Sequence, residues 1–177
     1  SCEKKTEGFT AEQRKAAEFA LKGIYSPDTL EAIQHRMQEK GDVLGSIVVL
    51  REWGRILRNE SRFDEALRVH SEGLRQAEAV HDTIEWVRAL NNIGTNYRRL
   101  GILDAAQEYH YLAWKMSEAS TDTTFQAKKN KVISLNGLGN IYLSLGNYER
   151  ADSVLRKALA GEKELNSLFG QAINYAN

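Results

Sequence analysis

The sequence predicts an all-α fold in which antiparallel helix pairs stack into a solenoid. Three observations lead to this prediction. Apolar residues recur at the three- and four-residue spacing of a helix face. Glycines such as Gly146 stand where one helix must end and the chain must reverse. The same set of positions recurs in three stretches, at intervals of 40 and 45 residues, which is typical of a repeat solenoid.

The three stretches share small and large apolar residues at matching positions. Each predicted first helix carries a glycine in its apolar face, and a glycine there lets the paired helix approach closely. The matching sets are Leu50, Trp53, Gly54 and Leu57; Leu90, Ile93, Gly94 and Tyr97; and Leu135, Leu138, Gly139 and Tyr142. We therefore predict three full units at residues 44–82, 83–122 and 123–166, the third with an extended first helix.

These small–large pairs, glycine turns and alanines in the second helix resemble the tetratricopeptide repeat (TPR). The resemblance implies a right-handed α-α superhelix whose first helices line a concave groove that binds peptides or partner helices. The units here are longer than the usual repeat of about 34 residues and lack the proline that usually ends its second helix. We therefore expect longer helices than the family normally has.

Two more helices are predicted before the first full unit. Thr10 with Gln13 has the spacing of a capping box, which opens a helix that we expect to reach about residue 23. Ser26 can cap the next helix, and Pro27 suits its first turn because the missing N–H is no loss there. Residues 10–43 are therefore interpreted as a degenerate helix pair that covers the first full unit.

The two ends of the chain carry weaker patterns. Residues 1–9 are polar and lack a cap, so we expect a flexible tail. Residues 167–177 have the pattern of another first helix, which predicts a truncated fourth repeat and about nine helices in all. A solenoid cut there would expose an unfinished apolar face. We therefore expect this sequence to be a piece of a longer protein.

Composition excludes some classes of function. The formal net charge is zero, whereas a protein that binds duplex nucleic acid normally carries a basic excess. No apolar run is long enough to span a membrane. The single cysteine, Cys2, excludes an internal disulfide and resembles the lipid-bearing first residue of a mature bacterial lipoprotein. The alternative is a free thiol in the tail.

The resemblance places polar side chains of the first helices along the groove. Neighbouring members are three or four residues apart, so they share one helix face or the adjoining one. The groove residues are Arg51, Arg55 and Arg58; Arg88, Asn91, Asn92, Thr95, Arg98 and Arg99; and Asn136 and Asn140. Amides suit a peptide backbone and arginines suit carboxylates, so we expect an acidic or extended peptide as the partner. The alternative is a solvated surface with ion pairs to Glu52 or Glu85.

Two histidines occupy the same repeat position. His70 and His110 lie one unit apart, so they could bind a metal or sense pH. Leu155 fills that position in the third unit, which favours packing. We therefore predict no metal site and no cofactor.

Enzyme motifs are absent from the sequence. It has no glycine-rich phosphate loop after a strand and no His-Glu metal motif, so we predict a protein-binding scaffold and not an enzyme.

A second resemblance suggests where such a scaffold would act. Residues 89–97, 134–140 and 170–177, with a cysteine near the start, resemble the extracytoplasmic TPR region of bacterial membrane-bound regulators. The resemblance implies sensing or scaffolding in envelope signal transduction, with a possible membrane tether or homo-oligomer. The alternatives are a cytoplasmic adaptor or assembly chaperone with no membrane link, and an enzyme with a TPR appendage.

Overall fold

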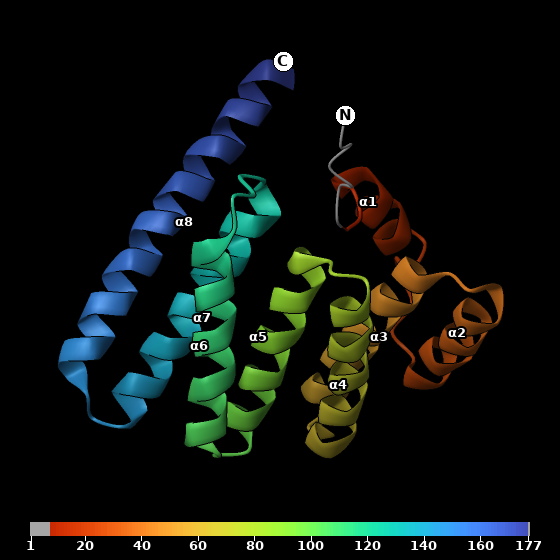
Figure 1. Ribbon diagram of the computed structural model, residues 1–177, viewed down its shortest axis with the longest axis horizontal. Helices are drawn as coiled ribbons and strands as arrows, with labels where there is room; N and C mark the ends of the chain where they lie inside the picture. The colour runs from red at the N-terminus through yellow and green to blue at the C-terminus, as the bar shows by residue number, and fades with distance from the viewer. Residues whose placement is uncertain (1–7, 177) are drawn as a thin grey trace, which may run out of the picture. The chain divides into compact units, whose positions relative to one another are not determined.

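The computed structural model describes residues 8–176, with side chains described as far as residue 168. In this part of the chain there are eight helices and no strands, which confirms the predicted all-α class (Figure 1). The helices are α1 (Ala11–Phe19), α2 (Pro27–Lys40), α3 (Val43–Asn59), α4 (Phe63–Ala79), α5 (Thr83–Arg99), α6 (Leu103–Ala119), α7 (Phe125–Ser144) and α8 (Tyr148–Ala176).

The chain divides into two compact units. The first extends to Asn92 and the second begins at Ile93, so the division falls inside α5. The first unit holds α1 to α4 and the first turns of α5, and the second holds the end of α5 with α6 to α8.

Helix α3 is the centre of the first unit. It packs against α1, α2 and α4, and it has an apolar side chain at most positions of its first turns. Leu30 of α2, Val48 and Leu57 of α3 and Ala66 of α4 are all fully buried. Because neighbours lie on several sides of α3, its sequence from Leu44 to Leu50 is almost continuously apolar apart from two small residues.

Helix α7 has the same role in the second unit, where it packs against α6 and α8. Leu138 and Tyr142 of α7 and Ala151 of α8 form the buried cluster, and Trp114 of α6 and Leu155 of α8 pack against it. Helix α7 has 20 residues, whereas α3 and α5 have 17 each, so the first helix of the third repeat is longer, as its extra residues predict.

The predicted helix starts are confirmed. Thr10 and Gln13 form the reciprocal capping box of α1, and the Ser26 side chain accepts a hydrogen bond at the start of α2, where Pro27 is the first residue. Gly41 ends α2 with a φ of 69°, a left-handed conformation that favours glycine. These positions depend on local chemistry, so the local sequence is sufficient to predict them.

Three expectations need correction. Helix α1 ends at Phe19, earlier than predicted, and its packing contacts are with α3. No new helix begins near residue 167, because α8 continues without a break to Ala176. Residues 1–7 of the expected tail lie outside the described residues, but Phe9 packs against the core of the first unit. Phe9 is apolar, and burying it against that core is favourable.

Candidate functional site

The predicted groove arginines of the first unit lie on one face of α3. The Arg51 side chain is 10% exposed, whereas the Arg55 side chain is 43% exposed. Arg58 donates a hydrogen bond to the Asn92 side chain of α5 at 3.2 Å. Asn91, beside it, is buried. The structure therefore brings together the predicted groove residues of α3 and the first half of α5.

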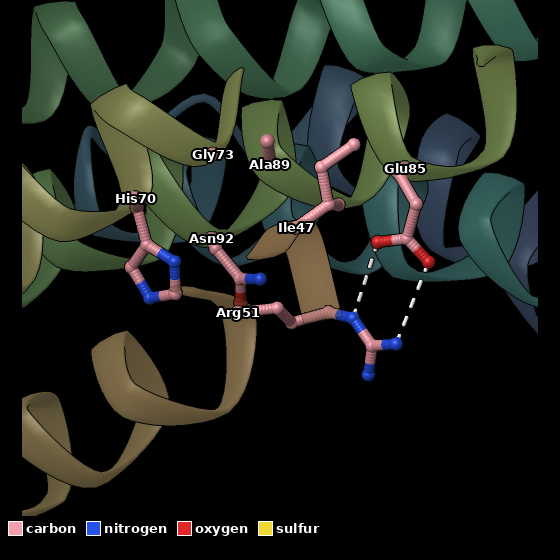
Figure 2. A pocket seen from close by; sticks show the side chains of 7 residues that line it. All are labelled: Ile47, Arg51, His70, Gly73, Glu85, Ala89 and Asn92. Carbon is pink, nitrogen blue, oxygen red and sulfur yellow. Dashed lines mark hydrogen bonds and ion pairs between the residues drawn. The ribbon is translucent and has the colours of Figure 1, made fainter. Parts of the chain in front are cut away.

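A buried carboxylate organises this face. The side chain of Glu85 is only 1% exposed, and three arginines contact it. Arg51 Nε lies 3.1 Å from Glu85 Oε2, Arg14 Nη1 lies 3.1 Å from Oε1, and Arg88 Nη1 lies 3.3 Å from Oε1. Figure 2 shows the Arg51 guanidinium directed at this carboxylate, and both residues line a small pocket. A buried charge must be paired in this way, because an unpaired one would be strongly destabilising.

Helix α1 supplies the other half of the network. Arg14 pairs with Asp82 at 2.7 Å and also donates to the carbonyl of Phe9. Glu18, one turn further along α1, accepts from Arg51 at 2.8 Å and from Arg88 at 3.3 Å. Two charged side chains of α1 therefore contact the face that the sequence assigns to an external partner.

The electrostatics of Glu85 follow from these contacts. Burial alone would raise its pKa, but the combined attraction of Arg51, Arg88 and Arg14 is larger, so the pKa of Glu85 lies below its ordinary value. The same network acts on Arg88, whose pKa is lowered by burial and by the nearby charge of Arg51. The carboxylate therefore stays ionised at neutral pH.

These contacts bear on the alternative interpretation of the arginines. Arg51 pairs with Glu85, and Arg55 pairs with Glu52 at 2.8 Å, as the alternative interpretation states. These pairs are only partly solvated, however, since Glu85 and Arg51 are largely buried. The sequence patterns do not assign Arg14, Glu18 or Asp82 to a charged network. The helical spacing of Glu85 and Arg88 was a usable local signal, but Arg14 and Asp82 are too far apart in sequence to give one.

The remaining predicted groove residues lie in the second unit. Thr95 and Arg98 are partly buried on the last turns of α5, and Arg99 is exposed. Asn136 of α7 donates to Glu162 of α8 at 3.0 Å, and Asn140 is exposed one turn later.

The hollows of the first unit differ in what they could hold. The space lined by Arg51, His70, Glu85 and Asn92 is about 10 Å³, room for roughly one water molecule. Two larger hollows, of about 330 and 560 Å³, lie between α2 and α4 on either side of Gln38 and Arg75. The space beside Glu85 is therefore too small to hold a small-molecule ligand.

The packing interpretation of the two histidines is confirmed. His70 and His110 are 2% and 1% exposed, and each ring lies against a glycine of a first helix. In the part of the chain with described side chains, no three His, Cys, Asp or Glu residues gather as a metal site. No helix among the described residues is long and apolar enough to cross a membrane. Cys2, the predicted lipid attachment residue, lies outside those residues.

Comparison with known proteins identifies the repeat. Residues 134–168 match the tetratricopeptide repeat family. The structure is also similar to the crystal structure of BtubC (BKLC) from P. vanneervenii, with a TM-score of 0.62 and 14% identity over 88% of this chain and 72% of that one. At this identity the likeness shows the fold alone. No curated protein matches the chain.

The family match and the structural likeness confirm the predicted fold class, an all-α superhelical solenoid of antiparallel helix pairs. The TPR is in general a non-catalytic scaffold that binds proteins or peptides.

Proposed function

We propose that this TPR protein binds a partner polypeptide on the face formed by α3 and the first turns of α5. The observation that carries the proposal is the row Arg51, Arg55 and Arg58, whose guanidinium groups are fixed by Glu85, Glu52 and Asn92. Side chains that are already ordered lose less entropy when a ligand binds. Solenoid proteins use extended faces of this kind for binding.

The most exposed ion-paired arginine of the row indicates the chemistry of the partner. Arg55 is the most accessible of the arginines that are described with an ion pair on this face, and its guanidinium can still donate to a carboxylate of a bound segment. Asn92 and Arg58 add amide and guanidinium donors for a peptide carbonyl. These groups support an acidic or extended segment as the ligand.

The test begins with random phage-displayed peptides selected on the full 177-residue chain. Selected peptides are then titrated against the wild-type chain, against Arg55→Ala/Arg58→Ala and against Arg62→Ala/Arg75→Ala. The control pair removes the same charge from the N-cap of α4 and from α4 itself, where each arginine pairs with a nearby glutamate. Circular dichroism checks that all three chains are folded.

We expect affinity to fall at least tenfold for the α3 variant and to stay unchanged for the control. Equal affinity for all three chains would place the binding site elsewhere. Selection that yields no specific peptide, either on this chain or on one in which Arg14 and Glu18 are replaced by alanine, would remove the scaffold proposal itself.

The biological setting that we propose is the bacterial envelope, as the sensing or interaction region of a regulatory protein. Its support is Cys2 near the start and the resemblance of residues 89–97 to such regions. The test is incorporation of a palmitate analogue into the full-length protein in a bacterium, with Cys2→Ala as control. Label that depends on Cys2 supports the envelope setting, and an unlabelled protein in the cytosolic fraction supports the cytoplasmic adaptor.

A further inference from the structure

Helix α1 contacts the first unit mainly through charged side chains, while apolar residues on either side of it, Phe9 and Leu21, pack against the core. It has nine residues, and Arg14 is the only one of them that is fully buried. Ala17 is its partly buried contact with the apolar core, while Phe19 is 73% exposed. In contrast, α3 and α4 join through buried apolar residues such as Leu57 and Ala66. The contacts made by the helix itself are therefore mostly polar, in contrast to those between α3 and α4.

The charges of α1 meet a matching pattern on the scaffold. Arg14 and Glu18 are four residues apart, so both project from one face of the helix. Arg14 meets the acidic pair Asp82 and Glu85 at the start of α5. Glu18 meets the basic pair of Arg51 and Arg88. The face thus has an acidic end and a basic end, spaced to fit one helical turn.

The N-terminal segment follows the same face further. A Cβ added to Gly8 would lie 3.0 Å from an Asp82 side-chain oxygen, so the backbone of residue 8 runs close over this carboxylate. The Arg14 guanidinium also donates a hydrogen bond to the carbonyl of Phe9, which fixes the segment before the helix begins. Residues 8–18 therefore lie over the binding face as a bound peptide would.

We propose that residues 8–19, the cis segment, occupy the partner site of this scaffold, and that the partner is a helix with an arginine four residues before a glutamate or aspartate. The inference rests on the proposed function and specifies its ligand. The partner's basic residue takes the place of Arg14 beside Asp82 and Glu85. Its acidic residue takes the place of Glu18 beside Arg51 and Arg88.

Tethering explains how the site stays closed without a partner. A short tether gives the cis segment an effective concentration on the order of millimolar at its own site. A free peptide at micromolar concentration therefore competes poorly until the cis contacts weaken. Release of the cis segment leaves Glu85 paired with Arg51 and Arg88, so the open face keeps its charge pattern.

The experiment measures binding of a fluorescent peptide with the sequence of residues 8–22 to the full chain. The wild-type chain is compared with Arg14→Ala/Glu18→Ala and with the control Glu12→Ala/Lys15→Ala. The control changes one acid and one base at exposed positions of the same helix. We expect at least tenfold tighter binding to the first variant and no change for the control. A peptide that itself carries Arg14→Ala should lose that binding.

A second measurement covers the case in which the Arg14→Ala/Glu18→Ala chain is poorly folded. Native-state hydrogen exchange on the wild-type chain should show the amides of α1 opening while those of α3 and α4 stay protected. The proposal is overturned if the α1 amides exchange only together with α3. It is also overturned if the folded variant binds the peptide no better than the wild-type chain.

These outcomes separate the two proposals. If phage-selected peptides bind the wild-type chain and the Arg14→Ala/Glu18→Ala chain equally, the scaffold function stands and the cis segment is only structural. If neither chain binds any peptide, the scaffold function fails with it.

Discussion

The imidazole ring of His70 lies against the α-carbon of Gly54, in the space where another residue would carry its side chain. A Cβ added to Gly54 would stand 2.7 Å from His70 Nδ1, closer than real carbon contacts allow. Each of the three repeats has the same contact, between a glycine and a residue sixteen positions later. The other pairs are Gly94 with His110 and Gly139 with Leu155. Each helix pair is therefore fitted together by a glycine on the first helix and a larger side chain on the second.

The glycine–histidine contact predicts a coupled pair of substitutions. Gly54→Ala should destabilise the protein by about 1–3 kcal/mol, because the added methyl group overpacks a buried ring. His70→Ala should also destabilise, because it leaves a cavity. In the double variant the methyl group enters that cavity, so the loss should be smaller than the sum. Urea unfolding of the four chains measures the coupling, and strict additivity would show that the two residues do not pack together.

The same contact predicts that Gly94→Leu destabilises the helix pair by about 1–3 kcal/mol or more, since the Cβ alone would lie 2.8 Å from the His110 ring. Gly101→Ala, at a site where a Cβ meets nothing nearby, tests backbone strain alone because its φ is 78°. Thermal unfolding distinguishes the two variants. Replacing His110 with a smaller residue should restore melting temperature to Gly94→Leu but not to Gly101→Ala. An unchanged melting temperature for Gly94→Leu would contradict the packing.

Buried histidines also predict acid sensitivity. Burial, with the charges of Arg58 and Arg51, lowers the pKa of His70 to about 3, against a hydrogen bond to the Gly54 backbone that acts in the opposite direction. Burial and Arg98 lower the pKa of His110 to about 4. Below pH 6.5 these histidines bind protons in the unfolded chain but not in the folded chain, so the free energy of unfolding falls as the pH falls. Each histidine should contribute a slope of at most about 1.4 kcal/mol per pH unit.

The control for this prediction comes from the chain itself. Leu155 shows that leucine fits against the glycine at this position, so His70→Leu/His110→Leu should fold at neutral pH. Its unfolding free energy should change much less between pH 6.5 and about 4.5. His35→Leu, at an exposed position on α2, should keep the wild-type slope. Equal slopes in all three chains would show that the buried rings are already protonated or not buried in solution.

The sequence predicts the local and repeated features of this protein far better than its long-range ones. The caps at Thr10 and Ser26 depend on neighbours within one turn, and the glycine–ring contacts recur at a fixed spacing, so both leave a pattern. The docking of α1 leaves none. Arg14 contacts Asp82 across 68 positions, on a helix with no strong apolar face, and its pairing appears only once the chain is folded.

The buried network predicts a large effect for a small change at Glu85. Glu85→Gln removes the charge that faces Arg14, Arg51 and Arg88, and should destabilise the protein by roughly 3–5 kcal/mol because buried arginines lose their partner. Asp152→Asn breaks an exposed pair with Arg156 and should change stability very little, because solvent screens that pair. Chemical denaturation compares the two, and similar losses would show that the network is solvated.

A buried amide without hydrogen-bond partners predicts a substitution that stabilises the protein. Asn96 is 0% exposed, and neither atom of its side-chain amide has a hydrogen-bond partner. The equivalent residues of the other two repeats are Ile56 and Ile141, which are both buried. Asn96→Val removes two unpaired polar atoms and should stabilise the protein by about 1–2 kcal/mol, since such atoms lose their hydration without compensation.

The matched control is Asn130, a second buried amide, whose side-chain oxygen accepts a hydrogen bond from Gln126 at 2.8 Å. Asn130→Val should destabilise the protein, because it removes this hydrogen bond and leaves the Gln126 donor without its acceptor. Thermal unfolding should therefore move in opposite directions for the two valine variants. A fall in melting temperature for Asn96→Val would mean that water or another group pairs with this amide in solution.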